Sequence, residues 1–274
     1  MGNLLKDKGL SDDRLFSLCL NNKEFSKMLL EIILGVDIEE LEIIQTQKAI
    51  RNLAEGCKGV CLDAYIKADG KIYNVEMQCE RRVWGNSGDS IVKRDRFYQG
   101  MLDTSNLQAG SKFNYNDLKD TIIIFIADYD VFGRGLYSYR FREKLIGEDS
   151  FELSSGTEKI FLNTKGTVRI DESDDLIKLL EYITDSRESV AEGSMRVTEL
   201  SNYFIRLKGD ENMNDNYLRL EYENQDGQYK EQVKQVRRQY DFGNSVKDIM
   251  KILGYDEDFV RRCIYEYQKE KEKA

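Results

Sequence analysis

Apolar residues recur at helical spacing at the start of the chain. One set shares a helix face that Ser11 is placed to cap, and its members are Leu15, Leu18 and Cys19. A second set follows Asn22, another N-cap residue, and ends at Gly35, a residue typical of helix C-termini. Its members are Phe25, Met28, Leu29 and Ile32. Two helices are therefore expected before the first strand.

Strand-like runs of apolar residues come next. Residues 38–45 predict a short strand, and residues 48–58 predict a loop. Residues 60–67 and 72–79 alternate between apolar and polar positions on either side of Ala68-Asp69-Gly70-Lys71. An Asp-Gly pair between two such runs is the strongest local signal for a β-hairpin with a two-residue type I′ turn.

The turn sets the register of this hairpin. If Ala68 pairs with Lys71, Asp63 lies opposite Glu76, and alternation puts Gln78 on the same face. The opposite face is expected to be the core face, formed by Val60, Leu62, Ala64, Ile66, Tyr73, Val75, Met77 and Cys79.

The rest of the chain predicts a mixed architecture. Residues 91–102 predict a helix and residues 121–127 a buried strand. Further strands are expected at 136–142 and 159–162, and helices at 174–183, 195–207, 228–240, 245–253 and 256–267. We therefore expect an α/β fold with a mixed central sheet over residues 1–185, and a helical C-terminal region over 186–274. The last two helices resemble a helix-turn-helix, but acids at the start of the second favour packing or self-association over DNA reading.

Composition narrows the function classes. Among 274 residues there is no histidine, which excludes Ser-His-Asp triads and HExxH metalloproteases. The net charge of −9 weighs mildly against nucleic-acid binding, although a local basic cluster can outweigh it. Without a CxxC pair, zinc binding by Cys57, Cys61 and Cys79 is disfavoured. The longest apolar run, residues 122–127, is too short to span a bilayer, and no signal peptide is evident, so a cytoplasmic protein is expected.

Two opposed acids in the hairpin need a compensating charge. Like charges directly opposite each other on paired strands are destabilising. A divalent cation held by Asp63 and Glu76 would relieve the repulsion, and Mg²⁺ suits one or two carboxylates completed by water and phosphate oxygens. The alternative is an exposed hairpin face that merely carries acids, because solvent weakens such repulsion.

At these positions the chain resembles a known family. Asp63 followed by Glu76-Met77-Gln78 is similar to the PD-(D/E)xK nuclease motif, with glutamine in place of the usual lysine. The wider passage resembles the Rpn family of recombination-promoting nucleases, also described as transposases, over residues 4 to about 185. The matching segments are 10–13 with Phe16, 60–63, 73–78, 93–99, 132–136 and 160–166. Where relatives tend to have proline, this chain has Val92 and Val131.

The resemblance implies a restriction-endonuclease-like core and cleavage of double-stranded DNA, linked to recombination or mobile elements. Asp63 and Glu76 would hold Mg²⁺, or Mn²⁺, with the backbone carbonyl of Met77 as a further ligand. Gln78 could orient the attacking water but supplies no positive charge, so slow turnover is expected. An acid of the N-terminal helices, Asp13 or Glu31, is a candidate for completing the site, although helix-end charge and a solvated face are the favoured explanations of these residues.

Basic residues follow the hairpin closely. Residues 80–96 carry a net charge of +2 in a chain of −9. Those expected to contact DNA, together with an aromatic residue of the same helix, are Arg81, Arg82, Lys93, Arg94, Arg96 and Tyr98. The alternative is an ordinary charged helix face.

A nuclease is therefore the favoured function. A catalytically weakened DNA-binding or protein-interaction module on the same fold is the alternative, kept open by Gln78. The sequence leaves a homo-oligomer open.

Overall fold

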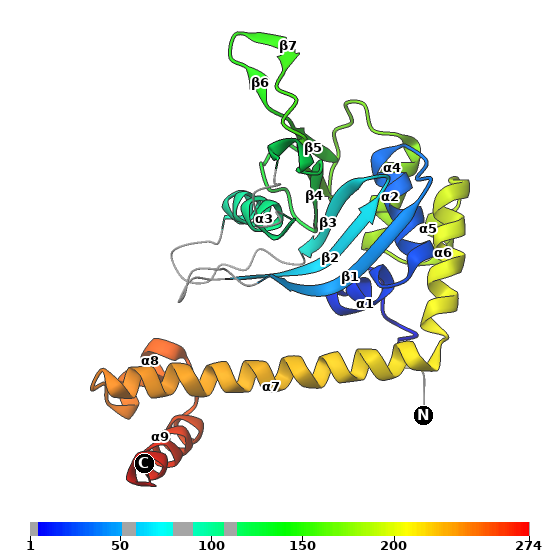
Figure 1. Ribbon diagram of the computed structural model, residues 1–274. Helices are drawn as coiled ribbons and strands as arrows, with labels where there is room; N and C mark the ends of the chain where they lie inside the picture. The colour runs from blue at the N-terminus through cyan, green and yellow to red at the C-terminus, as the bar shows by residue number, and fades with distance from the viewer. Residues whose placement is uncertain (1–4, 51–58, 79–89, 107–113, 274) are drawn as a thin grey trace. The chain divides into compact units, whose positions relative to one another are not determined.

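The structure is a computed structural model that describes residues 5–50, 59–78, 90–106 and 114–273 (Figure 1). The chain divides into two compact units, Met1–Asn214 and Asp215–Ala274. The helices between residues 186 and 208 belong to the first unit, where α6 (Met195–Lys208) packs against α2 (Lys23–Leu34) and α4 (Asp174–Thr184).

A six-stranded mixed sheet forms the centre of the first unit. Its strands lie in the order β1 (Leu41–Ile50), β2 (Val60–Ala68), β3 (Lys71–Gln78), β4 (Thr121–Ala127), β8 (Thr157–Asn163) and β5 (Ser138–Phe141). The first three strands are antiparallel, β3, β4 and β8 run parallel, and β5 returns antiparallel to β8. The α/β class and the mixed sheet expected from the sequence are confirmed.

Helices cover both faces of this sheet. Figure 1 shows α3 (Ile91–Asn106) on one side and α2 (Lys23–Leu34), α4 (Asp174–Thr184) and α6 (Met195–Lys208) on the other. The short helices α1 (Asp13–Leu20) and α5 (Glu188–Ala191) complete the unit, with the 3-10 turn η1 (Tyr115–Asp117) before β4. No helix among the described residues is long and apolar enough to cross a membrane.

The helix ends follow the expected signals with one correction. Asn22 caps α2 by accepting from two backbone N–H groups, and Gly35 ends it in the left-handed conformation at φ 70°. The cap of α1 is Asp12, not Ser11, because its carboxylate accepts the N–H of Leu15 at 3.1 Å.

The β2–β3 hairpin has the predicted turn and register. Ala68 pairs with Lys71, and the pairing continues to Ala64 and Val75. Asp69 and Gly70 have positive φ values of 47° and 72°, as a type I′ turn requires.

The sequence predicted that only one face of the β2–β3 hairpin is buried. That prediction is wrong, because both faces are covered in the structure. Leu62, Ala64 and Val75 are fully buried as expected. The opposite face is also covered, because α3 packs its own apolar residues against the sheet there. That cluster includes Tyr65, Ile72, Leu102, Ile123, Phe125 and Phe161.

Three segments differ from the expected elements. Strand β1 runs on to Ile50, so the expected loop begins inside it, and residues 51–58 lie outside the described part. The hairpin of β6 (Lys144–Leu145) and β7 (Glu148–Glu152) was not expected, because its strands are short and rich in charge. The helix expected at 228–240 is the end of α7 (Glu211–Asp241), whose earlier turns carry few apolar residues to reveal it.

The second unit is a small helical cluster. It comprises α7 from residue 215, α8 (Val246–Leu253) and α9 (Glu257–Lys273). Ser245 and Asp248 form a capping box at the start of α8, and Gly254 ends that helix at φ 72°. Its hydrophobic core cluster is formed by Val236, Ile249, Val260, Cys263 and Ile264.

Candidate functional site

The β2–β3 ladder gives way to side-chain contacts at the two predicted carboxylates. Beyond the Ala64–Val75 pair, the N–H of Asp63 donates to Glu76 Oε1 at 2.9 Å. The N–H of Met77 donates to Asp63 Oδ2 at 3.3 Å. Each carboxylate therefore replaces a backbone acceptor of the other strand, which brings the two acids together where the strands separate.

Burial makes both charges costly. Glu76 is only 3% exposed. This burial and the nearby Asp63 carboxylate raise the pKa of Glu76 to about 8. Burial raises the pKa of Asp63 to about 6, opposed by the Met77 N–H and reinforced by Asp13. Two carboxylates held together in this way, one buried and one half-buried, favour a shared proton or a bound cation.

Arg94 and Tyr98 of α3 face the carboxylates. The two residues lie one helical turn apart, and Arg94 Cζ is 5.9 Å from the Tyr98 ring centre and 5.3 Å from that of Phe125. The guanidinium lowers the pKa of both Asp63 and Glu76. Burial and the Glu76 carboxylate raise the pKa of Tyr98, so its phenol stays protonated.

The remaining predicted DNA contacts are placed differently. Lys93 and Arg96 are exposed on the outer side of α3, and neither forms an ion pair within the part of the chain that the structure describes. Arg81 and Arg82 lie outside the described residues. The basic segment thus contributes one side chain to the carboxylate site and two to an outer surface.

Gln47 of β1 is a site residue that the sequence did not reveal. The paired positions step from Thr46–Ala64 to Lys48–Leu62, and Gln47 adopts a positive φ of 51° opposite Asp63. Its Nε2 lies 3.4 Å from Asp63 Oδ1 and 3.3 Å from Ser17 Oγ. A polar residue in a stretch expected to turn into a loop gave no signal of this contact.

Gln78 and the candidate third acids complete the neighbourhood. Gln78 Nε2 donates to the carbonyl of Met77 at 2.6 Å, so these two predicted groups engage each other. Asp13 acts on Asp63 electrostatically. Glu31, the other candidate acid, makes contacts away from the two carboxylates. It accepts a hydrogen bond from the N–H of Ile38 at 2.9 Å and forms an ion pair with Lys27.

The donor set limits which metal fits. Among the described residues, no three His, Cys, Asp or Glu side chains are grouped to hold an ion. Two carboxylates with a nearby carbonyl match Mg²⁺, which keeps several waters and takes substrate phosphates as ligands. Of the three cysteines considered for zinc, Cys61 is exposed beside Gln47, while Cys57 and Cys79 lie outside the described residues.

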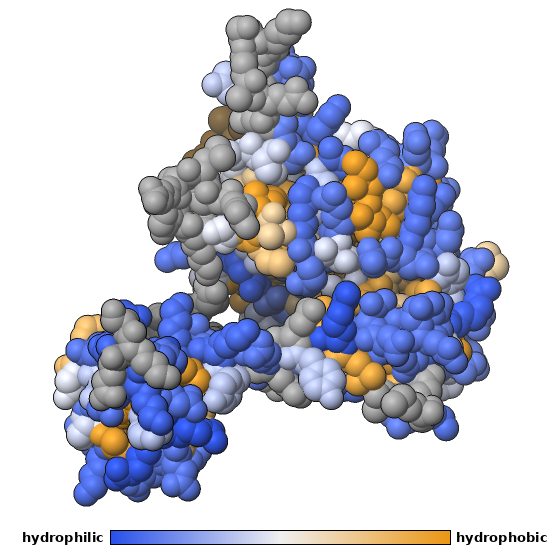
Figure 2. Space-filling view, turned by 60° about the horizontal axis from the view of Figure 1, so that its bottom comes forward, coloured by the Kyte–Doolittle hydropathy of each residue, from blue (hydrophilic) through white to orange (hydrophobic). Residues whose placement is uncertain are grey.

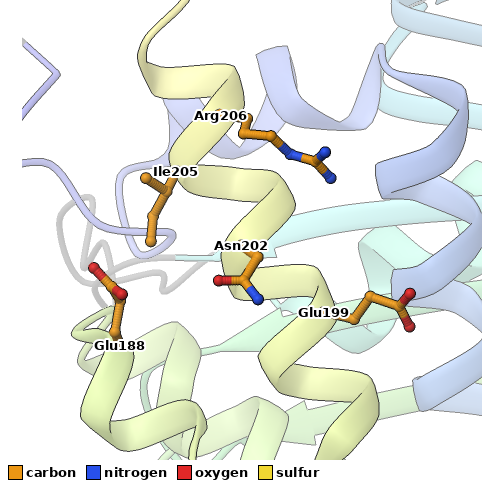
Figure 3. A pocket seen from close by; sticks show the side chains of 5 residues that line it. All are labelled: Glu188, Glu199, Asn202, Ile205 and Arg206. Atoms are coloured by element: carbon orange, nitrogen blue, oxygen red, sulfur yellow. The ribbon is translucent and has the colours of Figure 1, made fainter.

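A separate hollow of ≈ 530 Å³ lies between α5 and α6 (Figure 3). Its lining combines two carboxylates, an amide, a guanidinium and one aliphatic side chain, from Glu188, Glu199, Asn202, Ile205 and Arg206. None of the predicted site residues lines it.

Comparison with known proteins identifies no relative: no family model, no curated protein and no solved structure matches this chain.

Proposed function

We propose that this chain is a Mg²⁺-dependent nuclease that hydrolyses phosphodiester bonds of double-stranded DNA. The observation that carries the proposal is the convergence of a buried acid, Glu76, and a half-buried one, Asp63, both with raised pKa values, beside the Arg94 guanidinium. A restriction-endonuclease-like core and a link to recombination or mobile elements belong to the same proposal, and their support is the motif resemblance.

Asp63 and Glu76 would hold the cation, with the Met77 carbonyl as a further ligand if Gln78 releases it. Bound Mg²⁺ (or Mn²⁺) would polarise the scissile phosphate and lower the pKa of an attacking water. The two carboxylates have lone pairs left for this task, because a carboxylate offers about four acceptor positions and each is engaged through only part of them.

Arg94 supplies the positive charge that Gln78 lacks. A guanidinium stays protonated and can donate two parallel hydrogen bonds to a phosphate. Anchored over Phe125 and Tyr98, Arg94 would neutralise the extra negative charge of the pentacoordinate phosphate in the transition state. Gln78 would orient the attacking water but could not accept its proton.

The test is nicking of supercoiled plasmid with Mg²⁺, with and without chelator. We expect Asp63→Asn and Glu76→Gln to fall to the no-enzyme background, because each keeps its shape but loses the charge that binds the cation. Asp103→Asn is the matched control, since Asp103 lies on α3 and bonds only Gln99 among the described residues. Equal nicking by all variants would refute the site.

Gln78→Lys separates the nuclease from the alternative of a weakened DNA-binding module. If the chemistry is present but slow, a lysine should retain or raise the nicking rate, because it adds a cation near the attacking water. If wild type and Gln78→Lys both bind DNA without cutting it, the weakened module is the better description.

A further inference from the structure

A β-hairpin of the first unit presents large apolar side chains to solvent. Strands β6 and β7 follow β5, and Figure 1 shows them projecting beyond the end of the sheet. Ile146 at the tip is 100% exposed, and Leu145, Phe151 and Leu153 are 49%, 56% and 58% exposed. Two strands alone are marginally stable in water, and clustered exposed apolar residues mark interaction surfaces. The β6–β7 hairpin therefore has the composition of a surface that binds another molecule.

Its charge indicates what covers it. Residues 143–153 contain four acidic residues and one lysine, a net charge of −3. This charge repels the phosphates of DNA and of anionic lipids, and it attracts a protein surface that is both basic and apolar.

The outer side of α3 is such a surface. Val92 and Phe97 are 45% and 37% exposed there, beside Lys93 and Arg96. Helical spacing places Val92 next to Arg96 and Lys93 next to Phe97, so apolar and basic groups alternate along one stripe. In Figure 2, the visible face of the described residues is mainly hydrophilic, with hydrophobic colour in separate patches.

Gly100 continues the stripe. It is exposed, and a Cβ built there would meet nothing within 4 Å, so internal packing does not require glycine. Glycine within a helix is about 1 kcal/mol less favourable than alanine. A bare backbone at this point allows a neighbouring chain to approach closely, which suits the tip of a hairpin.

We propose that the β6–β7 hairpin of one copy docks on the outer side of α3 of a second copy. Ile146 and Phe151 contact Val92 and Phe97, and the hairpin acids face Lys93 and Arg96. In the proposed dimer a two-fold axis makes this contact twice, with each hairpin lying on α3 of the other copy. This inference does not depend on nuclease activity.

The experiment measures the mass of the full chain by analytical ultracentrifugation from about 1 to 200 µM, a range that brackets micromolar affinity. A concentration-dependent dimer is expected. The double variant Glu143→Lys with Glu148→Lys reverses the sign of the charge on the hairpin. The double variant Lys93→Glu with Arg96→Glu reverses the sign of the charge on the outer side of α3. Each double variant alone should be monomeric, because both of its contacts then join like charges.

Mixing the two double variants gives the decisive result. A reversed hairpin then meets a reversed helix, and the unmodified hairpin meets the unmodified helix, so both contacts regain opposite charges. A one-to-one mixture should form a heterodimer with an affinity within about tenfold of wild type. The control, Lys71→Glu with Lys119→Glu, changes the charge of the first unit equally at exposed positions and should leave the dimer intact.

The apolar part is tested by Ile146→Ser, which should weaken the dimer about tenfold or more. At a concentration where wild type is monomeric, the two proteins should have the same melting temperature. Ile170→Ser, at a residue 69% exposed, is the matched control. A monomer at every concentration, or a dimer that the charge reversals leave unchanged, would overturn the proposal. Monomeric double variants that stay monomeric on mixing would overturn it as well, provided that circular dichroism finds both folded.

Discussion

Glu76 links the stability of the protein to its proposed chemistry. Its pKa is raised from 4.5 to about 8, first by burial and then by Asp63. Between these two values the folded chain holds a proton that the unfolded chain has lost, so the free energy of unfolding falls as pH rises. The arrangement that suits a cation is thus unfavourable for the metal-free protein above neutral pH.

Glu76→Gln should therefore stabilise the metal-free protein at pH 8 to 9 while abolishing nicking. The amide oxygen can still accept the Asp63 N–H, but no buried charge has to form. We expect a gain on the order of 1 to 3 kcal/mol at high pH and little change near pH 5. Urea unfolding at several pH values in chelator measures it, and a loss of stability at pH 9 would contradict the assigned burial of charge.

Gln47 combines backbone strain with a contact to Asp63. A side chain in the left-handed region costs roughly 1–2 kcal/mol relative to glycine, and such strain often accompanies functional sites. We predict that Gln47→Gly is more stable than Gln47→Ala by about 1 kcal/mol, because only glycine relieves the φ of 51°.

Both Gln47 variants should lose the same function, since both remove the amide that reaches Asp63. The measurement is the rise in melting temperature on adding Mg²⁺, which should shrink equally in the two. If only the alanine variant loses this response, backbone strain rather than the amide is what matters.

At the scale of elements, the β2–β3 hairpin was predictable because one dipeptide sets its turn and its register, and this register brings Asp63 and Glu76 together. The crossing hydrogen bonds at those acids were not predictable, since alternation places side chains on faces but does not say where a ladder ends. The contact between Gln47 and Asp63 was not predicted for a related reason. It depends on the pairing of β1 with β2, and the sequence alone does not show which strand β1 pairs with. Arg94 was found as a basic residue, but only the packing of α3 on Phe125 separates it from Lys93 and Arg96.

Two glycines with open surroundings should respond oppositely to alanine. Gly70 has a φ of 72° in the turn, and Gly100 lies within α3 without a positive φ. We expect Gly70→Ala to destabilise the protein by about 1–2 kcal/mol and Gly100→Ala to stabilise it by about 0.5–1 kcal/mol. Thermal unfolding of the two variants measures both effects. A stabilising Gly70→Ala would show that the hairpin turn differs from type I′, and a destabilising Gly100→Ala would show that α3 needs glycine there.

At the scale of the whole molecule, a net charge of −9 has to be reconciled with DNA as substrate. Local charge decides contact with phosphate, and two of the cations proposed for it, Lys93 and Arg96, are exposed without an acidic partner in the described part of the chain. The acidic hairpin carries charge of the opposite sign, so the proposed dimer contact and DNA would use the same face of α3. Binding of DNA should then favour separated copies.

The last prediction tests this face by salt. Each phosphate contact contributes about 0.9 to the slope of log affinity against log salt, so Lys93→Glu with Arg96→Glu should flatten that slope by about two units. Binding to a short duplex is measured in Ca²⁺, a cation commonly used to permit binding without cleavage, and affinity should fall for all sequences alike.

Two double variants serve as controls for this measurement. Lys71→Glu with Lys119→Glu controls for net charge. Glu143→Lys with Glu148→Lys controls for loss of the dimer, because it keeps both α3 cations. A slope that flattens equally in the hairpin variant would mean that dimer formation, not phosphate contact, sets the salt dependence. A slope unchanged in the α3 variant would place the DNA on another surface of the chain.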